Sequence, residues 1–169
     1  MQLNINLNNE KAQVGIIDML ASVFIFMILM TVVMIYWYDY NRTLLDRLEK
    51  ENSMTIALGV TDNLIKNPGK PTDWNSSNVL VIGLASSDRI LSEEKVQSFC
   101  NISYNQTRAL LNIMHQFYFS ILTYQSGSWS KKEIECGLIP SANATTVINV
   151  ARPVVYKNQL ALMKFYLWR

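Results

Sequence analysis

A run of apolar residues near the beginning of the chain constrains it most. Twenty consecutive residues without a charged side chain extend from Met19 to Tyr38. At about 1.5 Å per helical residue the run covers roughly 30 Å, the hydrocarbon thickness of a bilayer. Tyr36, Trp37 and Tyr40 at its end are aromatic residues of the kind that settle at lipid headgroups. The sequence therefore predicts one transmembrane helix. The alternative, a buried helix of a globular core, would need a polar stripe that the run lacks.

The same run differs from a cleaved secretory signal. It is longer than the apolar stretch of about 7 to 15 residues in such signals, and it ends in aromatic residues instead of a small-residue cleavage site. The composition of the whole chain is that of a folded protein: 50% of residues are hydrophobic and 17% are charged, which excludes intrinsic disorder. The net charge of +2, from 15 basic and 13 acidic side chains, is too even to favour nucleic acid as a partner.

The helix is expected to continue beyond the membrane. Charged and apolar residues are interleaved over residues 39–66, with Leu44 and Leu48 at helical spacing. Pro68, followed by a glycine, provides the stop, because proline cannot continue a helix. We predict a long helix over residues 13–67, apolar in its first half and amphipathic in its second, followed by a domain over residues 68–169.

Two features place the later part of the chain outside the cell. Cys100 and Cys136 are the chain's two cysteines, an even pair that an oxidising compartment allows to form a disulfide worth about 3 to 4 kcal/mol. The chain also holds five Asn-x-Ser/Thr sequons, each a candidate for N-glycosylation. These begin at Asn41, Asn75, Asn101, Asn105 and Asn143. The alternative is two buried free thiols and sequons that arise by chance.

The segment before the apolar run carries a recognisable pattern. Lys11, Ala12 and Gln13 are a basic residue, a small residue and a glutamine, and they precede an apolar helix with one acid, Asp18, near its start. This pattern resembles the class III signal peptide of archaeal type IV pilin-like proteins. The resemblance implies that a prepilin peptidase cuts on the cytoplasmic side, after Ala12 or within a residue of it. Residues 1–12 would then be a leader.

The later part of the chain also resembles this family. The segments are Pro68–Asn75, Asn78–Ala85 and Leu91–Val96. The resemblance implies a precursor held in the cytoplasmic membrane and a mature form in an extracellular filament on the cell surface. Its partners would be copies of itself, the prepilin peptidase and the pilus assembly machinery, as well as the membrane before assembly. None of these motifs is catalytic.

The presence of an acid, Asp18, in an apolar helix also needs a physical explanation. A carboxylate at the centre of a membrane helix costs about 2.5 to 3.5 kcal/mol, so it persists where something compensates it. The dipole of a helix starting near Gln13 would favour a negative charge in its first turns. In a filament Asp18 could also face the new N-terminal amine of a neighbouring subunit and set register. The alternative is that Asp18 reaches lipid headgroups at the cytoplasmic face.

The remaining residues predict an α+β domain: a small, mainly antiparallel sheet with short helices. Trp74 is expected to cap its core. A hairpin connection is expected at residues 156–158, and Pro153 suits an edge strand or a bulge. The expected helices cover residues 93–99 and 107–114, and the expected strands cover 79–84, 117–123, 132–136, 145–155 and 159–168.

The sequence does not favour an enzyme. Metal sites and catalytic dyads need clustered His, Cys or carboxylate groups, whereas His115 is the one histidine and suits a surface or interface position. Glu93 and Glu94 are adjacent and would point to different sides of a helix. We therefore expect no catalytic residue, cofactor or metal. Two functions remain: a structural subunit that polymerises through its helix, or a membrane-anchored extracellular binding domain that never polymerises.

Overall fold

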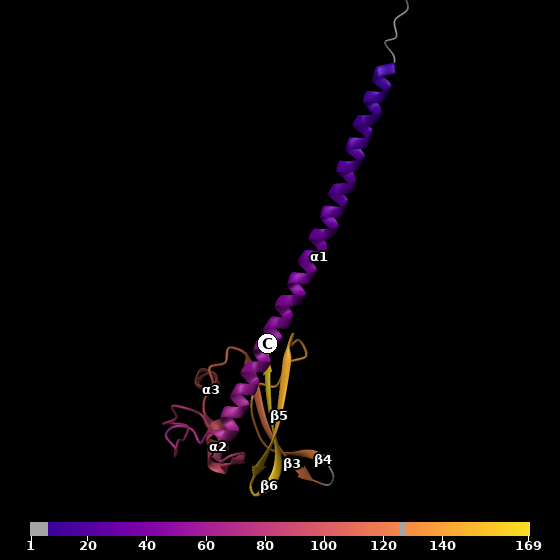
Figure 1. The fold of residues 1–169 in the computed structure, drawn as a ribbon. Helices are drawn as coiled ribbons and strands as arrows, with labels where there is room; N and C mark the ends of the chain where they lie inside the picture. The colour runs from indigo at the N-terminus through magenta and orange to yellow at the C-terminus, as the bar shows by residue number, and fades with distance from the viewer. Residues whose placement is uncertain (1–6, 126–127) are drawn as a thin grey trace, which may run out of the picture. The chain divides into compact units, whose positions relative to one another are not determined.

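The computed structural model describes residues 7–125 and 128–169, and it is an α+β protein, as the sequence predicted (Figure 1). The chain forms two compact units that meet between Leu48 and Glu49. The helices are α1 (Leu7–Lys66), α2 (Glu93–Asn101) and α3 (Tyr104–Leu110). The strands are β1 (Ala85–Ser87), β2 (Ile90–Leu91), β3 (Gln116–Gln125), β4 (Ser128–Gly137), β5 (Val147–Tyr156) and β6 (Gln159–Trp168).

Helix α1 begins at Leu7, six residues before the predicted start, and ends at Lys66, one residue before the predicted end. Its hydroxyl side chains bond to the backbone of their own helix. Ser22 Oγ donates to the carbonyl of Asp18 at 2.9 Å, and Thr31 Oγ1 donates to that of Met27 at 2.8 Å. An apolar helix can therefore carry these polar groups without a partner from elsewhere.

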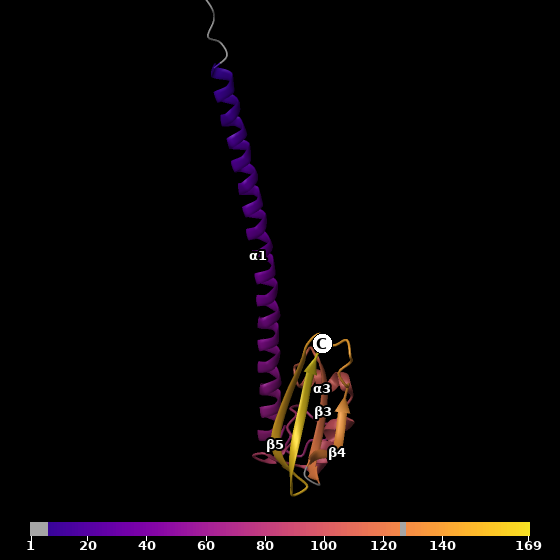
Figure 2. The same ribbon diagram turned by 90° about the vertical axis from the view of Figure 1, so that its right-hand side faces the viewer.

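The second unit is built on a six-stranded sheet in the order β1-β2-β5-β6-β3-β4. All neighbouring strands are antiparallel except β2 and β5, which meet at Ile90 and Val155. Figure 2 shows the long strands of this sheet, with β5, β3 and β4 labelled. The expected hairpin between β5 and β6 is present. Lys157 and Asn158 at its turn have φ values of 52° and 57°, as a two-residue turn that follows the twist of the strands requires.

One face of this sheet carries the core. Phe119, Phe165 and Val150 lie side by side on three adjacent strands, and all are buried. The last turns of α1 and helix α2 supply the opposing side chains, including Leu64 and Phe99. The rings of Phe99 and Phe119 meet edge to face with centroids 5.1 Å apart.

The predicted strand over residues 79–84 is wrong. This apolar segment, buried except at Leu80 and Val81, is a loop with one isolated bridge, between Lys70 and Val81. Its backbone covers the end of α1 instead: the amide of Leu84 donates to the carbonyl of Leu64 at 2.9 Å. A helix end leaves four carbonyls without intrahelical partners, and this loop satisfies some of them. Trp74 caps the same region as expected, with its indole N–H donating to the carbonyl of Gly83 at 2.9 Å.

The helix expected over residues 107–114 also differs from the structure. Helix α3 covers Tyr104–Leu110, and Asn112 then takes a left-handed conformation with φ of 53°. That conformation ends the helix before the predicted boundary. The short strands β1 and β2 were not predicted, because three and two residues are too few to show an alternating pattern.

Candidate functional site

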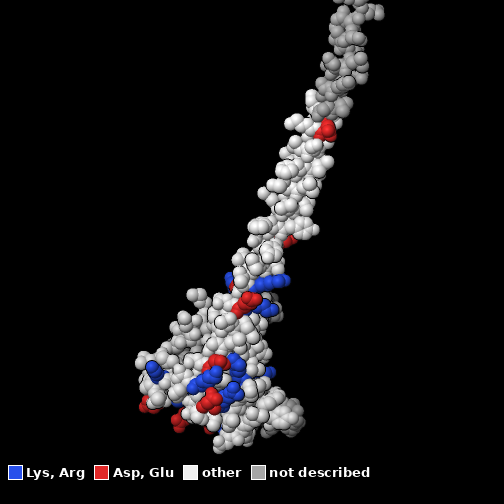
Figure 3. All heavy atoms as spheres, viewed as in Figure 1, with Lys and Arg blue, Asp and Glu red and all other residues white. Residues whose placement is uncertain are grey.

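The exposed surface of α1 in the first unit is the candidate functional site. From Ile16 the helix is long and apolar enough to cross a membrane, with a mean hydropathy of 2.6 in its most apolar window, and none of that window is buried within the chain. Figure 3 shows this part of the helix as mostly white atoms, while basic and acidic side chains gather on the sheet unit. Apolar surface of this extent needs lipid or protein around it. Its large exposed side chains include Phe24, Phe26, Met27, Leu29, Val33, Met34, Ile35 and Trp37.

The residues of the predicted cleavage site and the acid lie on this helix. The backbone of Lys11, Ala12 and Gln13 belongs to α1, while their side chains lie outside the part that the structure describes. Asp18 is exposed, and its backbone carbonyl accepts the hydroxyl of Ser22. The Asp18 carboxylate is thus on the helix surface, where a group from outside the chain can reach it.

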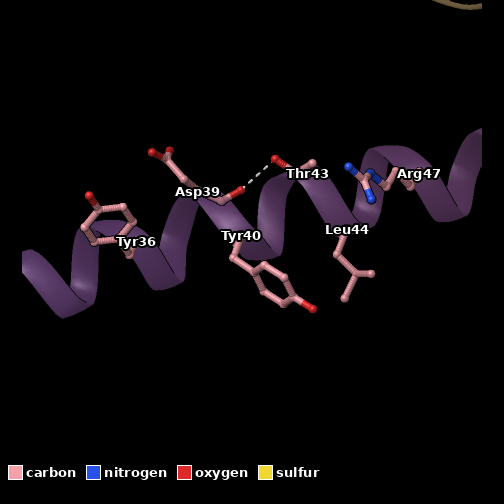
Figure 4. A pocket seen from close by; sticks show the side chains of 6 residues that line it. All are labelled: Tyr36, Asp39, Tyr40, Thr43, Leu44 and Arg47. Atoms are coloured by element: carbon pink, nitrogen blue, oxygen red, sulfur yellow. Dashed lines mark hydrogen bonds between the residues drawn. The ribbon is translucent and has the colours of Figure 1, made fainter.

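A groove lies on α1 just after the charge-free run (Figure 4). Asp39, Thr43 and Arg47 form one edge, at intervals of four residues, and Tyr40 and Leu44 form the other. Rows at this interval are the ridges through which helices interlock with other helices. Sequence reasoning missed the groove, although the spacing of these residues was readable as two parallel rows. Its full lining is Tyr36, Asp39, Tyr40, Thr43, Leu44 and Arg47.

The five sequons differ in their surroundings. Asn75 and Asn143 lie in exposed non-helical segments, and the Asn75 side-chain oxygen accepts the amide of Ser77 at 2.9 Å. Asn101 and Asn105 are exposed on short helices, but Thr107, the third residue of the second of these sequons, is buried. The fifth, Asn41, lies on α1 and donates its amide to the carbonyl of Trp37 at 3.0 Å.

The structure joins Cys100 and Cys136, the predicted pair, in a disulfide. The bond ties the last turn of α2 to the end of β4, which is the outer strand of the sheet. A free strand edge exposes unpaired backbone groups that can recruit other strands. Charged side chains on β4, among them Lys132 and Glu135, oppose such pairing.

Charged groups of the second unit form local networks. Lys132 Nζ lies 2.9 Å from Glu135 Oε2, and the Tyr118 hydroxyl donates to the same oxygen. These two donors hold the pKa of Glu135 below its ordinary value, while burial raises the pKa of Tyr118. On α2, Lys95 donates to the carbonyl of Pro68 at 2.7 Å, and burial lowers its pKa.

His115 lies where the sheet meets the last part of α1. Its Nε2 is 3.4 Å from the hydroxyl of Ser53, a buried residue of α1, and its Nδ1 is buried without a hydrogen-bond partner in the described part of the chain. His115 therefore packs inside the unit, between the sheet and α1. Within residues 7–125 and 128–169, no three His, Cys, Asp or Glu side chains gather closely enough to hold a metal ion.

Comparison with known proteins identifies no relative: no family model, curated protein or solved structure matches the chain.

Proposed function

We propose that this protein is a structural subunit of an archaeal type IV pilus-like surface filament and that it polymerises through α1. One observation carries the proposal: exposed apolar side chains recur on the helix past the length that a bilayer can cover. Beyond Tyr38, the side chains of Leu45 and Leu48 are 66% and 52% exposed. Lipid tails cannot cover residues so far past a span of about 20 residues, whereas helices of neighbouring subunits can.

Assembly through such a helix is physically feasible. A side chain that leaves lipid for a neighbouring apolar helix exchanges one apolar environment for another, so the favourable free energy comes from close packing. Methionine suits this exchange, because its flexible side chain adapts to different neighbours. Four methionines lie in the charge-free run: Met19, Met27, Met30 and Met34.

The test is to recover surface material by shearing cells that produce the protein and to sequence its N-terminus. A pilus-like subunit gives polymer of high mass that begins at Gln13 or an adjacent residue. A membrane-anchored binding domain, the second candidate, gives an intact Met1 in the membrane fraction and no polymer. This second outcome would reject the proposal.

Asp18 provides a second test. If its carboxylate sets the register of neighbouring subunits, Asp18→Ala leaves membrane insertion intact and reduces the yield of sheared filaments. Ser22→Ala is the matched control, since it removes a polar group one turn away whose hydroxyl bonds within its own helix. Normal filaments from the Asp18→Ala strain would remove Asp18 from the mechanism.

A further inference from the structure

The groove on α1 has an arrangement of charges that selects one way of packing two copies. Asp39 lies at the N-terminal end of one ridge and Arg47 at its C-terminal end, with Thr43 midway between them (Figure 4). Eight residues separate the acid from the base, which is about 12 Å along a helix. Among the described residues, neither side chain makes an ion pair. Both charges are therefore available to another molecule.

Apolar contacts would accompany these charges. Tyr40 and Leu44 form the other side of the groove, Tyr36 completes its lining, and the two tyrosines, Tyr36 and Tyr40, are 73% and 66% exposed. A groove between ridges of four-residue spacing accepts a ridge of the same spacing from a second helix. An identical helix carries such a ridge, because Asp39, Thr43 and Arg47 follow one another at intervals of four residues.

Membrane insertion restricts how two copies can meet. Both chains enter the bilayer with the same orientation, so their helices are parallel. Two parallel copies at equal depth would place Asp39 near Asp39 and Arg47 near Arg47, which is repulsive. A shift of one copy by eight residues instead places Asp39 of one copy beside Arg47 of the other.

We propose that this groove is a self-association site at which neighbouring copies of α1 pack in parallel, offset by eight residues, with Asp39 of one copy paired with Arg47 of the next. The inference rests on the proposed filament function. Two copies that span the same bilayer lie at the same depth, so a shift of about 12 Å between them requires that one has left the membrane for a filament. The pair between Asp39 and Arg47 thus forms as a subunit leaves the membrane. Before that, repulsion between the two Asp39 side chains and between the two Arg47 side chains opposes association of copies within the bilayer.

The sequon at Asn41 is compatible with this arrangement. Asn41 is not among the residues that line the groove, and it lies about 60° around the helix from Leu44, the lining residue nearest to it in rotation. Its side chain bonds back to Trp37.

Cross-linking tests the offset directly. Two tagged chains, one with Asp39→Cys and the other with Arg47→Cys, are produced together in the same cells. Cys100 and Cys136 are bonded to each other, so the new thiols are the reactive ones. Oxidation of sheared filaments should give the mixed 39–47 product about tenfold above the 39–39 product. A dominant 39–39 product in filaments would overturn the offset.

Charge reversal is the second arm. Asp39→Lys and Arg47→Glu should each lower filament yield about tenfold, and the double variant should restore most of it. Arg42→Glu is the matched control, because Arg42 is on the same part of α1 and does not line the groove. Failure of the double variant to recover would overturn the pairing. Absence of filaments from the unmodified chain would instead reject the proposed function itself, so the two failures are distinguishable.

Discussion

Arg152 on β5 reaches across to α1, where its guanidinium lies 2.6 Å from the carboxylate of Asp62. The register explains this contact, since Arg152 lies beside Met163 and therefore points to the core face of the sheet. Its Nε also lies 3.4 Å from the hydroxyl of Thr61, a fully buried residue. The contacts of Arg152 with Asp62 and Thr61 thus tie β5 to the last part of α1.

Removing this contact should destabilise the second unit. We expect Arg152→Ala to lower the free energy of unfolding by about 1 to 2 kcal/mol, because it removes a charged hydrogen bond and the packing of the aliphatic stem. Thermal unfolding of the full chain in mild detergent measures the change. Lys66→Ala is the control, because Lys66 pairs with Asp62 on the surface of the same helix and contributes less than about 0.5 kcal/mol. Equal effects of the two variants would contradict this account.

Two glycines should respond in opposite ways to alanine. A Cβ at Gly83 would lie 2.1 Å from the carbonyl oxygen of Asn67, so Gly83→Ala must displace the loop that covers the end of α1 and should cost about 3 kcal/mol. Gly59 lies within α1, and a Cβ there would meet nothing within 4 Å apart from its chain neighbours and the backbone of its own helix, so Gly59→Ala should stabilise by up to about 1 kcal/mol. Thermal unfolding of detergent-solubilised protein, followed by circular dichroism, tests both. A neutral Gly83→Ala would show that the loop yields easily.

The sequence predicted what depends on strong local patterns. The charge-free run led to an exposed apolar helix, and the alternating residues of β6 led to a strand with the predicted bounds. Pro153 was expected on an edge strand or at a bulge, but β5 is an interior strand between β2 and β6, and Pro153 is paired with Leu162 of β6 without a bulge. Strand β2 meets β5 at Val155 instead of at Pro153. The segment over residues 79–84 misled the prediction, because an apolar run that covers a helix end reads like a buried strand.

The candidate site was predicted less fully. Asp18 was identified because a lone acid in an apolar helix is conspicuous in a sequence. The groove was not, because Asp39 and Arg47 are ordinary charged residues on an amphipathic segment until their shared ridge is seen. His115 was expected at a surface or interface, yet its partner, Ser53, is 62 residues away in the chain. Contacts over such separations depend on the packing of the whole unit.

The disulfide should carry a large part of the stability of the second unit. Its cysteines are 36 residues apart, and closing a loop of that length stabilises by about 3 to 4 kcal/mol in the chain-entropy model. The double variant Cys100→Ala/Cys136→Ala should therefore unfold at a markedly lower temperature than the unmodified protein. Reduction of the unmodified protein should give the same shift. A small effect in both experiments would mean that the contacts of α2 with β4 hold the loop without the bond.

Glu135 should make stability depend on pH in the acidic range. Hydrogen bonds from Tyr118 and Lys132 hold the pKa of this carboxylate below its ordinary value of 4.5 in the folded protein. The stabilisation is therefore complete above that value and is lost as the pH falls through the lower, folded-state pKa. We expect the melting temperature of the unmodified protein to fall more steeply than that of Glu135→Gln between about pH 5 and pH 3. Tyr118→Phe, which keeps the ring and removes one donor, should lie between the two, and identical slopes for all three proteins would show that the network does not couple to folding.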